Sequence, residues 1–183
     1  MAAESATNGR AAMLARLVTD VRRHGLPPDP SLRQFADRLG TSHRMLAYYF
    51  SSLDGLLATV LATMRAQERE TLASLAAGKS LREAVEAMWA YYTDEARAPE
   101  HRAFFYVFAQ ALREPAAYED FLASLDAWVV ITAGLADAEG RPEATAQLLV
   151  SGVRGLLMDR LTSADPGPID AAFEYLLDAL LAR

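Results

Sequence analysis

The first recognisable pattern in the chain is an apolar stripe at helical spacing near the N-terminus. Its members recur at intervals of three and four residues: Leu14, Leu17, Val18 and Val21. Gly25 and the two prolines that follow it supply a stop signal, so the pattern predicts a helix over 11–24. No such stripe precedes it, and we expect residues 1–9 to be a disordered N-terminus.

Two short helices joined by a tight turn are predicted next. Ser31 and Gln34 form a capping box, in which the two residues cap the first turn of a helix reciprocally. Gly40 can adopt the left-handed conformation that ends a helix, and Ser42 can cap another helix only two residues later. The turn Gly40-Thr41-Ser42 therefore predicts a helix-turn-helix.

The second of these short helices has two unlike faces. At about 100° per residue, Leu46 and Phe50 point inward. The opposite face carries His43, Arg44, Ala47 and Tyr48. An ordinary solvated surface would also be polar, but the caps and the turn favour a face that enters the major groove of DNA. Tyr49 lies at the edge of the inward face, where core packing and phosphate contact are equal alternatives.

The rest of the chain consists of helical patterns separated by glycine and proline. They are predicted at 53–77, 80–97, 100–113, 116–137, 142–163 and 169–182. Because no alternating strand pattern occurs, the fold class is all-α with about nine helices. We expect a helix-turn-helix domain at 10–52, joined by a long fourth helix to a helical domain at 53–183.

Charge divides the chain in the same way. The 183 residues hold 18 basic and 24 acidic side chains, for a net charge of −6, yet residues 1–65 carry +3 and residues 66–183 carry −9. A small nucleic-acid-binding module on an acidic body has this asymmetry. The chain has no cysteine, which excludes disulfide scaffolds and thiolate chemistry. No apolar run approaches the roughly 20 residues of a membrane span, so we expect a cytoplasmic protein with no membrane partner.

The outward face offers specific chemistry for double-stranded DNA. Arg44 can bind guanine bidentately, and Ala47 or Thr41 can contact a thymine methyl group. The hydroxyl donors available for phosphates are Ser42, Tyr48 and Tyr49. Phosphate contacts of this kind would set the register of the helix on the duplex.

The segment resembles the TetR-type (TetR/AcrR) family of transcriptional regulators. The resemblance lies in SLRQFADRLGTSHRMLAYYFSSLDGLLATVL, residues 31–61, which follows that family's pattern of capped short helix, Gly-Val-Ser turn, Leu-Tyr-x-His/Tyr-Phe and capped fourth helix. Ala47 stands where the family usually has tyrosine, and Leu53 where a phosphate-contacting lysine is common. Phosphate affinity would then rest on Arg33, Arg44 and the tyrosines, with Ser31 a further candidate contact.

The resemblance also implies a small-molecule effector, held among the helices of the body. The aromatic and apolar candidates for its pocket are Met88, Trp89, Tyr92, Phe105, Phe108, Phe121, Leu125 and Trp128. Few charges interrupt their inward faces, so the effector is expected to be mostly apolar. Plain core packing is the alternative for each of them, because a bundle of this size needs such side chains.

The last two predicted helices carry the features of an interface. Ser151 and Gly155 put small residues one turn apart, and the stripe through Phe173, Leu177 and Leu180 is apolar. The alternative is that both stripes face the chain's own core. In the resembling family the corresponding helices form a four-helix bundle with a second copy, which implies a homodimer.

Together these observations predict a repressor that an effector releases from a palindromic operator. We expect neither catalysis nor a cofactor or metal, because no His-Glu-x-x-His, Gly-x-Ser-x-Gly or phosphate-binding glycine motif is present. The alternatives are a helical adaptor, a constitutive DNA-binding protein without an effector and, less favoured, a helical-bundle enzyme.

Overall fold

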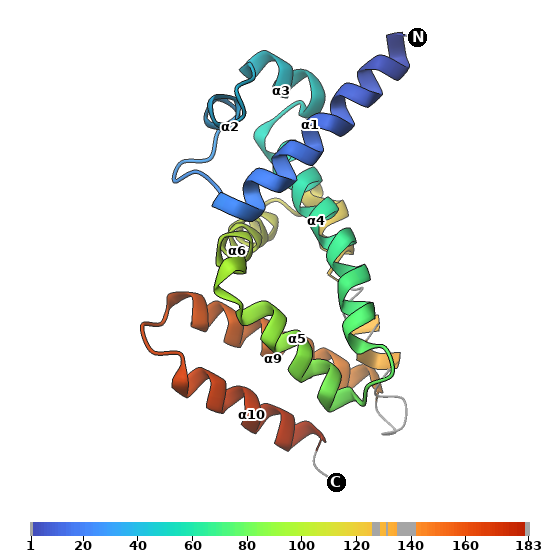
Figure 1. Cartoon of the computed structure of the whole chain (residues 1–183), viewed down its shortest axis with the longest axis vertical. Coiled ribbons are helices and arrows are strands. Elements are labelled where there is room, and N and C mark those ends of the chain that lie inside the picture. Colours follow the sequence, from blue (N-terminus) through green and yellow to red (C-terminus); the bar gives the residue numbers. More distant parts are fainter. Residues whose placement is uncertain (1, 126–128, 131, 135–141, 182–183) are drawn as a thin grey trace. The chain divides into compact units, whose positions relative to one another are not determined.

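A computed structural model describes residues 2–125, 129–130, 132–134 and 142–181 of the chain (Figure 1). The α-helices with assigned bounds are α1 Ala2–His24, α2 Leu32–Leu39, α3 His43–Phe50, α4 Leu53–Ala76, α5 Leu81–Thr93, α6 Ala98–Arg113, α7 Glu119–Ala123, α9 Pro142–Thr162 and α10 Gly167–Leu181. Two short 3-10 helices are η1 Glu95–Arg97 and η2 Pro115–Tyr118. No strand occurs within the described ranges, so the all-α prediction is confirmed.

The chain forms two compact units, and each is discontinuous in sequence. The first unit comprises Met1–Ala66 and Ala96–Ser124, and the second comprises Gln67–Glu95 and Leu125–Arg183. These units differ from the predicted division at residue 52, because α6 and α7 belong with the N-terminal helices. The predicted boundary at residue 52 separates a DNA-binding domain from the rest of the chain, and this functional division stays a prediction.

The N-terminus differs from its prediction. Helix α1 begins at Ala2, so residues 2–9, expected to be disordered, are helical. The segment MAAESATNGR is rich in alanine, the strongest helix former, and carries no proline. It also continues a helix that is anchored by buried side chains further along, so only propagation is required.

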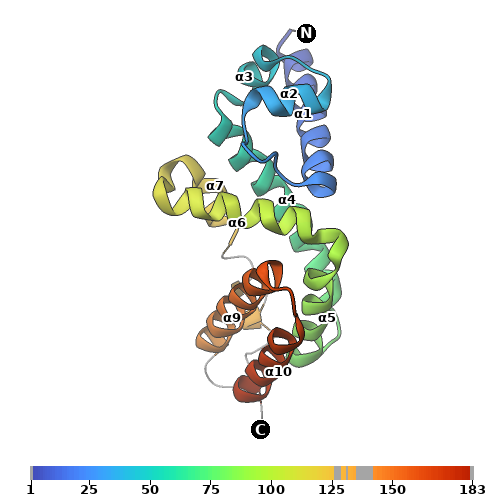
Figure 2. The same cartoon turned by 90° about the vertical axis from the view of Figure 1, so that its left-hand side faces the viewer.

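The core of the first unit is built where α1, α2 and α3 meet (Figure 2). The stripes predicted on these helices are buried, including Leu17, Val21, Phe35, Leu46 and Phe50. Helix α6 packs against α1. Glu100 of α6 is buried and accepts hydrogen bonds from Arg97 at 2.8 Å, with Arg22 of α1 3.6 Å away. An ion pair in a mostly apolar contact fixes how the two helices are oriented.

The prediction of a single helix over 116–137 is wrong. Helix α7 ends at Ala123, and Ser124 and Leu125 form a turn. The Ser124 hydroxyl donates to the Phe121 carbonyl oxygen at 2.5 Å. A serine that bonds to a nearby carbonyl offers the backbone an alternative to continued helix.

The second unit contains a helical hairpin, α9 and α10, and α5 packs against α9 (Figure 1). The hairpin is closed by Arg160 of α9, whose Nη1 lies 2.6 and 2.7 Å from the two carboxylate oxygens of Asp170 in α10. The rings of Trp89 in α5 and Phe173 in α10 stack with centroids 4.6 Å apart and planes 9° from parallel. These contacts join all three helices into one core.

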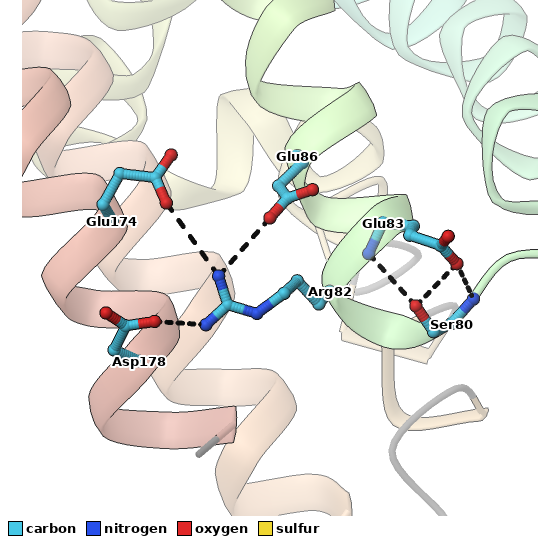
Figure 3. A network of polar contacts seen from close by, with 6 residues as sticks. All are labelled: Ser80, Arg82, Glu83, Glu86, Glu174 and Asp178. Atoms are coloured by element: carbon cyan, nitrogen blue, oxygen red, sulfur yellow. Dashed lines mark hydrogen bonds and ion pairs between the residues drawn. The ribbon is translucent and has the colours of Figure 1, made fainter.

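A polar network covers the edge of this core (Figure 3). Arg82 of α5 reaches α10, where its Nη2 lies 2.5 Å from Asp178, and its Nη1 lies 3.9 Å from Glu174. Glu86, one turn along α5, lies 3.4 Å from the same Nη1. Ser80 and Glu83 form a capping box at the start of α5.

No single helix in the described ranges is long and apolar enough to span a membrane. Helices α3 and α4 pass that test only as a pair, by length and composition, and they are bent by 68° at their junction. The same ranges hold no group of three or more His, Asp or Glu side chains placed to bind a metal ion.

Candidate nucleic-acid interface

The predicted helix-turn-helix is present at α2 and α3, and local hydrogen bonds define it. The Ser31 hydroxyl oxygen accepts from the Gln34 amide at 3.2 Å at the start of α2. Gly40 ends that helix in the left-handed conformation, with φ 60° and ψ 40°, which glycine adopts without steric penalty. The Ser42 hydroxyl oxygen then accepts from the Met45 amide at 3.2 Å and begins α3.

Helix α3 places its predicted faces as the spacing indicated. Leu46 and Phe50 are buried, whereas His43 and Arg44 are exposed. Tyr48 is the most exposed aromatic side chain of the first unit's described residues, at 68%. The inward anchors therefore leave the polar face free for a ligand.

The remaining predicted contacts lie on or beside this face. Arg33 and Ser42 are exposed, while Ser31, Thr41 and Ala47 are half-buried. The two serine hydroxyls use an oxygen lone pair for capping, so their O–H groups stay available as donors. We define the reading face as Arg33, Thr41, Ser42, His43, Arg44, Ala47 and Tyr48.

Tyr49 packs against α1. Its side chain is half-buried, and its hydroxyl group lies directly against Gly9 of α1. The ring meets that of Tyr48 edge-on, with centroids 5.3 Å apart. Tyr49 therefore lies between α1 and the reading face, and a phosphate contact by its hydroxyl group stays a prediction.

Three arginines of the basic N-terminal third are used to hold the first unit together. Arg10 Nε donates to the Tyr49 carbonyl oxygen at 3.1 Å, and Arg16 donates to the carbonyl of Leu39. Arg38 donates to the carbonyl of Gly25 at 3.1 Å and pairs with Asp20 at 2.8 Å. Sequence reasoning missed these roles, because the carbonyl partners lie 13 to 39 residues away in the chain.

Two arginines of the reading face remain available to a ligand. Arg33 and Arg44 are exposed, and no hydrogen bond or ion pair engages either guanidinium within the described part of the chain. A guanidinium with unused donors is suited to the paired acceptors of guanine or to phosphate oxygens.

The junction between α3 and α4 is a tight turn at Ser51. Ser51 has φ 65° and ψ −50°, and the Ser52 amide donates to the Phe50 carbonyl at 2.7 Å, as in a γ-turn. The Ser52 hydroxyl oxygen accepts from the Gly55 amide at 3.0 Å and caps α4. A Cβ atom at Gly55 would lie 2.4 Å from the Phe50 carbonyl oxygen, so only glycine fits there.

The same end of α4 is tied to η2. Tyr118, which is buried, donates its hydroxyl proton to Asp54 Oδ1 at 2.5 Å. Burial is the larger cause, and the hydrogen bond to a carboxylate the next, of a pKa of Tyr118 that lies above its ordinary range. The tyrosine therefore stays a neutral donor and holds the beginning of α4.

The predicted effector residues fall in both units. Met88, Trp89, Tyr92 and Leu125 belong to the second unit and are buried. Phe121 is buried in the first unit, where Phe105 and Phe108 are half-buried. Trp128 lies outside the described residues. The effector pocket stays a prediction, and one of its candidates, Trp89, is stacked on Phe173.

The predicted dimer residues separate into two groups. Phe173 and Leu177 are fully buried and pack in the core of their own chain. Ser151 is exposed, Gly155 and Leu180 are half-buried, and a Cβ atom at Gly155 would meet open space. Sequence reasoning missed three large apolar side chains that are exposed on α9 and α10: Leu148 at 56%, Met158 at 49% and Tyr175 at 76%.

Comparison with known proteins identifies the fold. No family model matches the sequence, and no curated protein matches it significantly. Among solved structures, a transcriptional regulator from Rhodococcus sp. Rha1 is similar with a TM-score of 0.77 and 24% identity, covering 93% of this chain and 95% of the other. The chain therefore has the fold of a class of helical transcriptional regulators.

Two further structures name that class more closely. A Rhodococcus protein assigned to the TetR family has a TM-score of 0.74 and 21% identity, covering 96% of this chain and all of the other (100%). NalD of Pseudomonas aeruginosa, the secondary repressor of the MexAB-OprM multidrug efflux pump, has a TM-score of 0.57 and 21% identity over 95% and 96% of the two chains. The fold is that of TetR-family regulators, as the motif at 31–61 predicted.

Proposed function

We propose that the protein is a sequence-specific DNA-binding transcriptional regulator. The reading face carries this proposal: a capped helix-turn-helix exposes Arg44 and Tyr48, while Arg10, Arg16 and Arg38 of the first unit are hydrogen-bonded within the chain. The fold of TetR-family regulators supports it. Selection of genomic DNA fragments on the immobilised protein, followed by sequencing, tests it, since recovery of no enriched sequence would contradict it.

Arg44 is the residue that we expect to read a base. Arg44→Ala should reduce the affinity for the selected site by about 1–3 kcal/mol and relax preference at one base position, with little change on unrelated DNA. Arg33→Ala is the matched control, because loss of a phosphate contact weakens binding to all sequences alike. Equal losses on every sequence in Arg44→Ala would reassign that residue to phosphate.

The proposed regulator is a homodimer on a palindromic operator. The exposed apolar side chains Leu148, Met158 and Tyr175, beside the small residues Ser151 and Gly155, support a second copy on the outer side of α9 and α10. Two reading faces related by a dyad require half-sites about one helical turn apart, roughly 34–36 Å. A monomer on an asymmetric site would contradict this arrangement.

We further propose that the protein is a repressor and that a small, mostly apolar effector releases it. NalD, which shares the fold, is a repressor. An effector couples to DNA only if its affinity differs between DNA-competent and other arrangements, and such coupling is commonly worth about 5–150-fold. Screening apolar aromatic compounds by melting temperature and operator affinity tests this part.

A constitutive DNA-binding protein without an effector is the second candidate. The observation that favours it is the stacking of Trp89 on Phe173, since a side chain that fills its own core leaves no space for a ligand there. A screen in which no compound both raises the melting temperature and lowers operator affinity would favour this candidate. Selective DNA recovery would still distinguish it from a helical adaptor.

A further inference from the structure

The start of α1 contacts the last turn of α3, the helix that carries most of the reading face. Gly9 lies so close to Tyr49 that an added Cβ atom would be 2.4 Å from the tyrosine hydroxyl oxygen and 3.3 Å from Cζ. The next residue, Arg10, donates from Nε to the Tyr49 carbonyl oxygen at 3.1 Å. Its guanidinium also lies over the Phe50 ring, 5.3 Å from the centroid.

These contacts act at the C-terminal end of α3. The N-terminal end is fixed by the turn and the Ser42 cap. At the other end the last carbonyls of a helix lack partners within the helix, and a cation there is favoured by the helix dipole. Helix α3 has no basic residue in its last turn. Arg10 of α1 supplies both the donor and the charge.

The contact continues to the reading face through adjacent aromatic rings. Tyr49 is half-buried against Gly9, and its ring meets that of Tyr48 at 5.3 Å and 61°. Tyr48 is exposed on the reading face. A displacement of Tyr49 away from α1 would therefore move Tyr48 and turn the last part of α3.

We propose that Gly9 and Arg10 form a clasp that positions α3 for specific DNA binding without either residue contacting a base. The inference rests on the proposed function, which it deepens by adding two positioning residues. It explains why a half-buried glycine occurs within α1, where alanine would be the better helix former. It also assigns a task to a segment that the sequence indicated to be disordered.

The test is a double-mutant cycle between positions 9 and 49, measured on the selected operator fragment and on a scrambled fragment. Gly9→Ala should lower specific affinity about tenfold, because the new methyl group collides with the Tyr49 hydroxyl group. In a Tyr49→Phe background, where that oxygen is absent, Gly9→Ala should change affinity by less than about threefold. Scrambled DNA should bind equally in all variants.

The denaturant midpoint separates positioning from stability. Gly9→Ala should leave it unchanged, because the helix propensity that alanine adds offsets the cost of displacing the half-buried Tyr49 side chain. Arg10→Ala should lower specific affinity about tenfold. Arg23→Ala also removes one exposed positive charge from α1 and should not lower it, because no hydrogen bond or ion pair engages Arg23 among the described residues.

Two results would overturn the clasp: unchanged specific affinity in Gly9→Ala, or an equal loss in both backgrounds. A loss that follows a lower denaturant midpoint would also contradict it, since the effect would then be unfolding. If the wild-type chain enriches no DNA sequence, the proposed function fails, and the clasp with it. If the wild-type chain binds and Gly9→Ala binds equally well, only the clasp fails.

Discussion

Ser51 has a backbone conformation that is unfavourable for any residue with a Cβ atom. Its φ of 65° is the only positive value at a non-glycine position among the described residues. Ser51→Gly removes the steric penalty and should raise the free energy of unfolding by about 1 kcal/mol, which urea denaturation can measure. The γ-turn bond between Ser52 and Phe50 uses backbone atoms alone and is retained.

An unchanged or lower stability in Ser51→Gly would contradict the assignment of strain to this residue. Ser52→Gly is a useful comparison, since Ser52 caps α4 through its hydroxyl group and has no positive φ. That substitution should lower the free energy of unfolding by roughly a few tenths of a kcal/mol, because glycine is itself tolerated at the N-cap position.

Individual residues were predictable where their partners are close in sequence. The caps at Ser31 and Ser42 and the left-handed Gly40 follow from signals within four residues, and all three occur in the structure. The roles of Arg10 and Arg38 did not follow, because each depends on a backbone carbonyl that another helix brings close. A basic side chain carries no sequence signal that separates a ligand contact from an internal one.

At the scale of the helix, α5 carries a titratable cap. Ser80 donates to Glu83 Oε2 from its amide at 2.9 Å and from its hydroxyl group at 2.7 Å. These bonds, the side-chain bond foremost, lower the pKa of Glu83 below its ordinary value. Because the folded-state pKa is the lower one, the stabilisation is present above the ordinary glutamate pKa and is lost as pH falls through the folded-state value.

The prediction concerns the difference in melting temperature between the wild-type chain and Glu83→Gln. Near neutral pH the wild type should have the higher melting temperature. The difference should disappear as pH falls below about 4.3, the ordinary pKa of glutamate. Thermal unfolding across that range measures it. In a Ser80→Ala background the difference near neutral pH should be smaller, and an undiminished difference would show that Ser80 is not the cause.

Helix type was easier to predict than helix extent. Apolar spacing located α4, α9 and α10, since these elements are long and their stripes regular. The predicted helix at 116–137 is interrupted after Ala123, where one serine side chain competes for a carbonyl. Helix α1 begins at Ala2, nine residues before its predicted start at residue 11. Both errors arise at helix ends, where single hydrogen bonds and distant contacts decide the outcome.

At the scale of the whole molecule, the burial of Leu177 changes how the dimer should be tested. Leu177 is fully buried in its own chain, so a charge there would unfold the hairpin without informing on a partner. Met158→Glu is the appropriate change, because Met158 is 49% exposed. The variant should be folded and monomeric by light scattering. Burial of an unpaired glutamate in the interface would cost roughly several kcal/mol and would oppose dimer formation.

One control and one further test accompany this measurement. Leu112→Glu alters an apolar side chain of α6 that is 70% exposed, and it should leave the dimer intact. Gly155→Leu adds bulk where the chain itself leaves open space, so it should disrupt only a partner. A dimer that persists in both Met158→Glu and Gly155→Leu would place the interface elsewhere.

The division of the chain into two discontinuous units limits how its parts can be exchanged. The backbone passes between the units at residues 66–67, 95–96 and 124–125. A chimera that grafts residues 1–66 onto a foreign body would lack Ala96–Ser124, including Tyr118, which holds Asp54 at the start of α4, and Glu100, which engages Arg22 of α1. Recombination at a single crossover therefore cannot transfer the first unit intact. A transplant that preserves its fold must carry Met1–Ala66 and Ala96–Ser124 together.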